Sequence, residues 1–115
     1  MKRKFPIAGA ILAVAAAGAL ALPTSGGAAN TTIKVGDDFF SPASKTVKKG
    51  TKIKFKWIGD RPHNVVKQKG PGGGFASRTT SARGVNFSKK FKKAGTYKII
   101  CTIHGGMQMT LKVKK

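Results

Sequence analysis

Four side chains in the C-terminal half of the chain have the types and the spacing of a site for a soft metal ion. The only cysteine, Cys101, is followed three residues later by His104 and six residues later by Met107, and the only other histidine is His63. Thiolate and thioether sulfur favour Cu(I), whereas imidazole suits both Cu(I) and Cu(II). These four ligands are those of an electron-transfer site of the blue-copper type. The pattern therefore predicts a copper site, and we expect no catalytic residue.

Other uses of the same residues explain the pattern less well. Zinc sites more often use paired cysteines or carboxylates, and a thioether is a poor zinc ligand. A hydrolase built on Cys101 and a histidine would need an orienting Asn or Asp and an oxyanion hole, and Asn64 beside His63 is too little for that. A copper reductase or oxidase would need further copper ligands, and the chain has no spare histidine. We therefore expect a protein that is not an enzyme.

The segments that must position these ligands have the pattern of short β-strands. Residues 52–57 alternate strictly, with Ile53, Phe55 and Trp57 on one face and three lysines on the other, which is the period of a half-buried strand. The other candidate strands are residues 31–35, 63–66, 85–91, 96–101 and 109–113, and residues 47–51 read as a strand end, a turn and a strand start. No stretch after position 30 has a convincing helical period. Several short strands between turns predict an all-β sandwich or barrel.

Two segments depart from simple alternation. In residues 85–91, Lys89 falls on the same face as Phe87 and Phe91, so we expect a bulge, an edge position or a lysine whose ammonium group reaches solvent. The glycine-rich residues 70–74 lack the Lys-Ser/Thr pair of a phosphate-binding P-loop, and we expect a flexible surface loop there. Turn residues mark two further connections, at residues 36–38 and 59–62.

The N-terminal residues have the composition of an export signal. Three positive charges in residues 1–4 precede an uncharged apolar run over residues 5–22, and small and polar residues follow. This order is that of a secretory signal peptide. We therefore expect a signal peptide over residues 1–29, one domain over residues 30–115, and a protein that is periplasmic, on the cell surface or secreted. An uncleaved anchor is the alternative, because the apolar run is only just long enough to span a bilayer as a helix.

The net charge of the chain is strongly positive. The 115 residues include 23 Lys+Arg and 3 Asp+Glu, a formal net charge of +20 at pH 7, and +17 remains without the three positive charges of residues 1–29. A basic surface suggests nucleic acid as a partner. Export counts against that partner, as do lysines spread along strand faces without interleaved aromatic rings. We expect the charge to steer an acidic partner or to hold the protein near an anionic envelope surface.

Further motifs accompany the candidate ligands. They are Phe-Ser-Pro at 40–42, Val-Lys-Lys-Gly at 47–50, Ile-Lys-Phe at 53–55, Pro-His-Asn-Val at 62–65, Ala-Gly-Thr-Tyr at 94–97 and the loop from Cys101 to Met107. With these motifs, residues 30–115 resemble a small cupredoxin, a blue copper protein, of the plastocyanin and amicyanin type. The resemblance implies a Greek-key β-sandwich, one copper ion and one-electron transfer between redox partner proteins. We expect a monomer, and a periplasmic copper carrier or copper-resistance protein is the alternative function.

The resemblance also assigns roles to individual residues by matching positions. It implies that His63, Cys101 and His104 are the strong equatorial copper ligands and that Met107 is the weak axial ligand. Asn64 matches an asparagine that joins the two ligand segments by hydrogen bonds. His104 would be the ligand whose edge reaches the surface and passes the electron.

The axial position has a second candidate. Plastocyanins place the methionine five residues after the histidine, which would select Met109, whereas the type with the shorter loop places it three residues after and selects Met107. Counting back from the alternating residues 111–113 supports Met107. We therefore expect Met109 to be an inward-facing strand residue.

Overall fold

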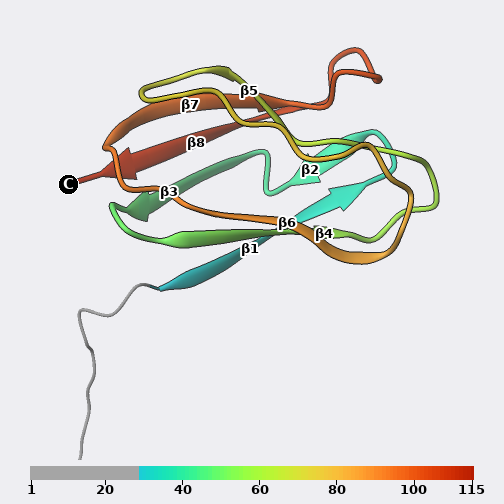
Figure 1. Ribbon diagram of the computed structural model, residues 1–115, viewed down its shortest axis with the longest axis horizontal. Coiled ribbons are helices and arrows are strands. Elements are labelled where there is room, and N and C mark those ends of the chain that lie inside the picture. Colours follow the sequence, from blue (N-terminus) through green and yellow to red (C-terminus); the bar gives the residue numbers. More distant parts are fainter. Residues whose placement is uncertain (1–28) are drawn as a thin grey trace, which may run out of the picture.

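The computed structural model describes residues 29–115, which form strands joined by turns and loops (Figure 1). The predicted signal peptide lies outside the described residues except for Ala29. The eight strands are β1 (Asn30–Gly36), β2 (Phe39–Ser41), β3 (Ser44–Lys48), β4 (Lys52–Trp57), β5 (Val66–Lys69), β6 (Gly84–Lys90), β7 (Gly95–Ile100) and β8 (Gln108–Lys114). Residues 29–115 contain no helix, and hence none long and apolar enough to cross a membrane.

Two four-stranded sheets pack into a β-sandwich (Figure 1). The strand order is β2-β1-β4-β6 in the first sheet and β3-β8-β7-β5 in the second. β1 and β4 are parallel, as are β3 and β8, and the other neighbouring strands are antiparallel. Five of the seven connections carry the chain from one sheet to the other, so strands far apart in the sequence become neighbours. The predicted all-β sandwich with Greek-key connections is confirmed.

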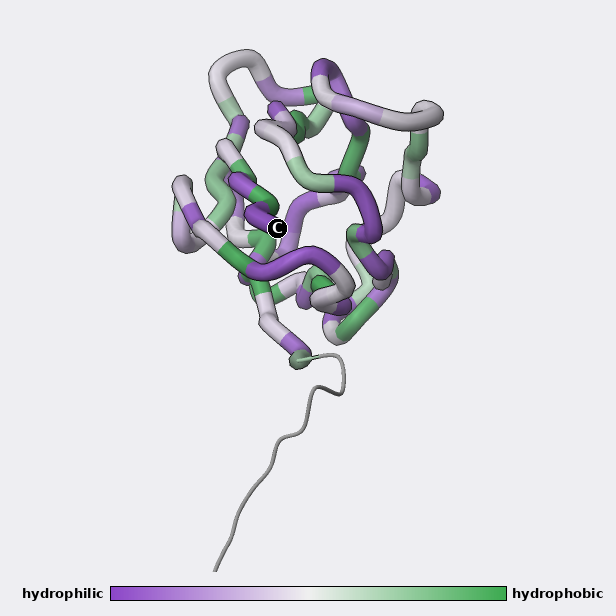
Figure 2. The backbone as a smooth tube through the Cα atoms, turned by 90° about the vertical axis from the view of Figure 1, so that its left-hand side faces the viewer, coloured by the Kyte–Doolittle hydropathy of each residue, from purple (hydrophilic) through white to green (hydrophobic). Residues whose placement is uncertain are grey.

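The core lies between the two sheets and follows the predicted alternation of apolar and polar residues. Strands β4 and β8 show it most clearly, with buried residues at alternate positions: Ile53, Phe55 and Trp57 in β4, and Met109, Leu111 and Val113 in β8. Figure 2 shows hydrophobic and hydrophilic residues alternating along the backbone tube. Burying a large apolar side chain contributes about 1.5–3 kcal/mol, so these strands form a stable base for the loops at their ends.

The sequence predicts a strand over residues 63–66, and that prediction is wrong. The segment that carries His63 is irregular in the structure. His63 forms one isolated bridge with Thr80, and β5 begins only at Val66. A physical reason lies at the preceding residue, because Pro62 has no N–H group to donate to a strand ladder. His63 is therefore a loop residue whose main chain pairs with a distant segment at one position, Thr80.

Two other boundaries differ from the prediction. β7 ends at Ile100, so Cys101 follows the strand and does not close it. β2 was not predicted, because three residues are too few to show a period, yet it pairs with the end of β1 across the turn at residues 37–38. Asp38 in this turn has a φ of 75°, a left-handed conformation that Asp tolerates better than most residues. The tight turn fixes the place of two adjacent carboxylates.

Strand β6 lies at the edge of its sheet, one of the arrangements expected for Lys89, whereas its bulge lies at Asn86 and not at Lys89 itself. It is the last strand of its sheet, and its register against β4 shifts at Asn86. Nζ of the half-buried Lys89 lies 5.3 Å from the centroid of the Phe75 ring and 5.9 Å from that of Phe91. These are cation–π distances, so the ammonium group is held over aromatic rings.

The glycine-rich residues 70–74 form a loop around one lysine. Nζ of Lys67 donates to the main-chain carbonyls of Pro71, Gly72 and Gly73 at 2.8, 2.7 and 3.2 Å. The loop lies beside the start of β7, at the opposite end of that strand from Cys101. Its carbonyls therefore bind a cation of the protein itself, far from the candidate ligands.

Candidate metal centre

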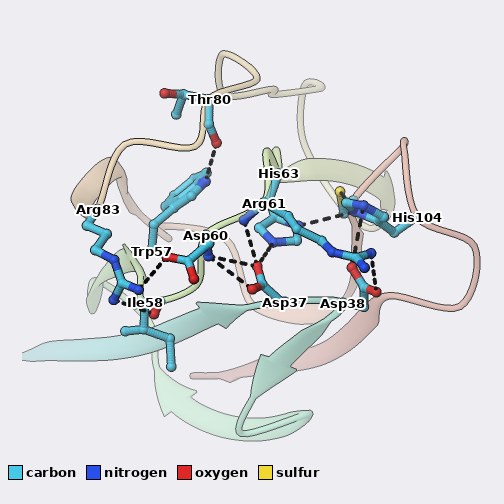
Figure 3. Close-up of polar contacts among 11 residues, drawn as sticks. Asp37, Asp38, Trp57, Ile58, Asp60, Arg61, His63, Thr80, Arg83 and His104 are labelled. Atoms are coloured by element: carbon cyan, nitrogen blue, oxygen red, sulfur yellow. Dashed lines mark hydrogen bonds and ion pairs between the residues drawn. The ribbon is translucent and has the colours of Figure 1, made fainter.

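The donor atoms of His63, Cys101 and His104 converge on one another, and Figure 3 shows the two imidazoles side by side. All three atoms lie within 4.8 Å of one another. Nδ1 of His63 is 3.2 Å from Nδ1 of His104, and Sγ of Cys101 is 3.5 Å from the same nitrogen. One thiol sulfur and two imidazole nitrogens facing one another are a donor set that fits a single copper ion. Three of the four ligands predicted from the sequence are thus brought together.

His63 is buried, and its main chain is fixed by hydrogen bonds. The residue is fully buried, its main-chain N–H donates to the carbonyl of Thr80 at 3.0 Å, and its own carbonyl accepts from the N–H of Thr80 at 3.1 Å. Nε1 of the buried Trp57 also donates to the carbonyl of Thr80, at 2.9 Å. The position of His63 is therefore set by core packing and by a fixed partner segment.

Cys101, His104 and Met107 share one short loop between β7 and β8. The N–H of Cys101 donates to the carbonyl of Met107 at 3.0 Å, and the N–H of Met107 donates to the carbonyl of His104 at 3.2 Å. Gly106 has a φ of 80°, which glycine adopts without the strain that a side chain would cause. The loop thereby folds back so that Met107, itself buried, lies beside the other two residues.

Met109 lies elsewhere. It is the second residue of β8, it pairs with Ile99 of β7, and it belongs to the buried core. Met107 therefore lies in the loop with Cys101 and His104, whereas Met109 lies within the sheet.

Asn64 connects the two segments that carry the candidate ligands. Its Oδ1 accepts from the N–H of Thr102 at 2.9 Å, and its Nδ2 donates to Oγ1 of Thr102 at 2.8 Å and to Oγ1 of Thr79 at 3.1 Å. Asn64 is buried and follows His63 directly, while Thr102 follows Cys101. The two segments are therefore joined next to their ligand residues.

Two carboxylates face the outer nitrogens of the two imidazoles, and sequence reasoning missed both. Oδ1 of Asp37 lies 3.0 Å from Nε2 of His63, and Oδ1 of Asp38 lies 3.4 Å from Nε2 of His104 (Figure 3). In the sequence, Asp37 and Asp38 are identified only as turn residues. One signal was available: the chain has only three acidic residues, and two of them are adjacent.

Asp37 is itself held firmly as an anion. Its carboxylate accepts from the N–H of Asp60 at 3.0 Å and from the N–H of Arg61 at 2.9 Å. These main-chain hydrogen bonds, together with the contact to His63, hold the pKa of the Asp37 carboxyl well below its ordinary value. Asp38 is paired with the guanidinium of Arg61 at 3.1 Å.

Comparison with known proteins agrees with this site and with the fold. The family model described as "Copper binding proteins, plastocyanin/azurin family" matches residues 28–114. Plastocyanin of Scenedesmus fuscus is 33% identical over 93 residues, which cover 70% of this chain and 93% of the relative. Plastocyanin A/B of Petroselinum crispum is 34% identical over 88 residues, which cover 67% and 91%.

Solved structures show the same fold. A reduced amicyanin variant superposes with a TM-score of 0.66 at 22% identity, covering 79% of this chain and 86% of the other. The purple cupredoxin of Nitrosopumilus maritimus gives a TM-score of 0.63 at 22% identity and covers 72% and 98%. Because the family model spans nearly all of residues 29–115 and the donor set fits one copper ion, the chain belongs to the plastocyanin/azurin family of copper-binding proteins, as a small cupredoxin whose cofactor is copper.

Proposed function

We propose that this protein carries single electrons between redox partner proteins through one copper ion held by His63, Cys101 and His104, with Met107 as the weak axial ligand. The observation that carries the proposal is the convergence of the three donor atoms within 4.8 Å. Bound copper supplies one-electron chemistry by cycling between Cu(I) and Cu(II). The residues of the chain supply a fixed ligand geometry, because hydrogen bonds hold both ligand segments and so limit rearrangement between the two states.

The surroundings of the two methionines support Met107 as the axial ligand. The main chain of Met107 is hydrogen-bonded to both Cys101 and His104, so its side chain starts from within the ligand loop. Met109 is committed to the sheet by its pairing with Ile99. In this proposal Met109 is a core residue with no part in binding copper.

The exposure of the ligands supports His104 as the route for the electron. Its side chain is 20% exposed, whereas His63 is 0% and Cys101 is 3% exposed. The exposed Ile103 and the exposed glycines at 105–106 adjoin it in the same loop. A small surface around an imidazole edge, bordered by the exposed side chains of Asp38 and Arg61, is suited to brief docking of a redox partner, so we propose that the docking patch lies at His104, Gly105 and Gly106.

The N-terminal residues and the net charge bear on where the protein acts and on its partners. We propose export to the periplasm, the cell surface or the medium, on the strength of the signal-like residues 1–29. The formal net charge of +17 on residues 30–115 supports a redox partner with an acidic surface. The same charge would favour association with an anionic envelope surface. We propose a monomeric carrier without enzymatic activity and without nucleic acid as its working partner.

Copper carriage without electron transfer is the competing function, and kinetics separate the two. Buried ligands such as His63 and Cys101 favour retention of the ion over its transfer. The test is the electron self-exchange rate, measured by NMR line broadening in mixtures of oxidised and reduced protein. Fast exchange, with Cu(I) retained against a chelator, supports an electron carrier. Slow exchange, with Cu(I) that passes readily to a chelator, would make the protein a copper carrier instead.

A further inference from the structure

The buried imidazole of His63 has an anionic partner on the side away from the metal centre. Nδ1 of His63 faces Nδ1 of His104, and Nε2 lies 3.0 Å from Oδ1 of Asp37. The side chain is 0% exposed, so Nε2 depends on the protein for a partner. When Nδ1 serves as a metal ligand, the ring proton must be on Nε2, which then donates to the carboxylate of Asp37.

The carboxylate of Asp37 is placed by the main chain of the loop before His63. The N–H of Asp60 donates to both of its oxygens at 3.0 Å, and the N–H of Arg61 donates to Oδ1 at 2.9 Å. Gly59 makes this approach possible, because a Cβ at that position would collide with the carboxylate. The hairpin turn after β1 and the loop after β4 therefore fit together around one negative charge.

The other two acidic residues are engaged differently. Asp38 is 3.4 Å from Nε2 of His104, but it also forms an ion pair with the guanidinium of Arg61 at 3.1 Å. Asp60 is 82% exposed and pairs with the guanidinium of Arg83. Among residues 29–115, Asp37 is thus the carboxylate that contacts a fully buried candidate ligand and forms no ion pair with Lys or Arg.

We propose that Asp37 is a positioning residue that lowers the reduction potential of the copper through its hydrogen bond to His63. A carboxylate on the outer nitrogen orients the imidazole and makes it a more basic ligand. A more basic ligand and a nearby negative charge stabilise Cu(II) more than Cu(I), because Cu(II) carries the higher charge. The inference rests on the copper centre of the proposed function and does not depend on which protein receives the electron.

The test is the reduction potential of the copper-loaded full chain, with Asp37→Asn as the first variant. Asn keeps the size of the side chain and removes its charge. Loss of a hydrogen-bonded partner of a metal ligand typically changes metal affinity about tenfold or more. We expect the ratio of Cu(II) to Cu(I) affinity to fall about tenfold, which raises the potential of this one-electron couple by about 59 mV.

Asp60→Asn is the matched control, because it removes the same charge from the same region without a side-chain contact to His63. Its potential should stay close to that of the unmodified protein. Equal shifts in Asp37→Asn and Asp60→Asn would overturn the proposal, because the effect would then be one of net charge alone.

Gly59→Ala provides a second test that keeps every charge and remains available if Asp37→Asn does not fold. The added methyl group displaces the Asp37 carboxylate from its place, so the potential should rise here as well. An unchanged potential in Gly59→Ala would overturn the proposal. Failure of the proposed function can be distinguished from failure of this inference. Slow self-exchange in the unmodified protein would contradict the electron-transfer function, whereas the comparison of reduction potentials among the variants would still test the role of Asp37.

Discussion

Asn64 and Thr102, which follow His63 and Cys101 directly in the chain, are joined by two hydrogen bonds. The N–H of Thr102 donates to Oδ1 of Asn64 at 2.9 Å, and Nδ2 of Asn64 donates to Oγ1 of Thr102 at 2.8 Å. The two ligand segments belong to different loops, one between β4 and β5 and the other between β7 and β8. The Asn64–Thr102 pair therefore fixes the position of His63 relative to Cys101, which a shared metal ion requires.

Replacing Asn64 by Ala should destabilise the protein. Asn64 is buried, and a buried polar group left without its partner costs about 1–3 kcal/mol. The measurement is the free energy of unfolding in denaturant. Asn86→Ala is the control, since Asn86 is only partly buried and bonds to Ala82 and Arg78 at the edge of the sheet, and we expect it to cost about 0.5 kcal/mol. Equal losses would contradict a special role of Asn64.

The two methionines should respond differently to replacement by Leu, which has a similar volume. Met107→Leu should change the visible spectrum and the reduction potential of the copper protein, because the axial ligand tunes both. Met109→Leu should leave the spectrum unchanged and cost less than about 1.5 kcal/mol of stability. A changed spectrum in Met109→Leu alone would transfer the axial role to Met109.

The positive charge should make electron transfer to small anionic oxidants sensitive to salt. The rate with hexacyanoferrate(III) should fall as ionic strength rises from about 0.01 to 0.15 M, because the Debye length shortens from about 30 to 8 Å. A cationic cobalt complex is the matched probe, and its rate should rise over the same range. If the rates with both probes did not change with ionic strength, the net charge of +17 on residues 30–115 would have no effect at the site of electron transfer.

The stability of the protein should fall at alkaline pH through Tyr97. Burial raises the pKa of Tyr97, whose hydroxyl donates to the carbonyl of Lys93 at 2.7 Å. The folded state therefore keeps the phenol proton to a higher pH than the unfolded chain, so this stabilisation is present below pH about 10 and is lost as the pH rises further. The measurement is the free energy of unfolding of the unmodified protein minus that of Tyr97→Phe across this range. A difference that stays constant would contradict the prediction.

The sandwich could be predicted from the sequence because its strands carry their own pattern. The alternation of Ile53, Phe55 and Trp57 places one face in the core whatever the partner strand is. The boundary at Cys101 and the irregular segment at His63 could not be predicted in the same way. They depend on pairing with distant residues, such as the single bridge between His63 and Thr80.

The cluster of His63, Cys101 and His104 and the neighbouring Asn64 could be predicted from the sequence, whereas the two carboxylates beside the imidazoles could not. Few side chains of the right type exist, so the spacing of Cys101, His104 and Met107 carried most of the information. The contact between Asp37 and His63 joins residues 26 positions apart, and it forms because the turn after β1 and the loop after β4 lie side by side. A local sequence pattern does not predict contacts between such distant segments.

Titration of the copper-free protein with Cu(II), followed by visible absorption, is the most direct test of copper binding by Cys101, His63 and His104. An intense thiolate-to-copper band should grow to one equivalent of copper and should be absent in Cys101→Ser. A colourless product, or a band that persists in Cys101→Ser, would contradict the assignment of Cys101, His63 and His104 as the ligands of a blue-copper centre.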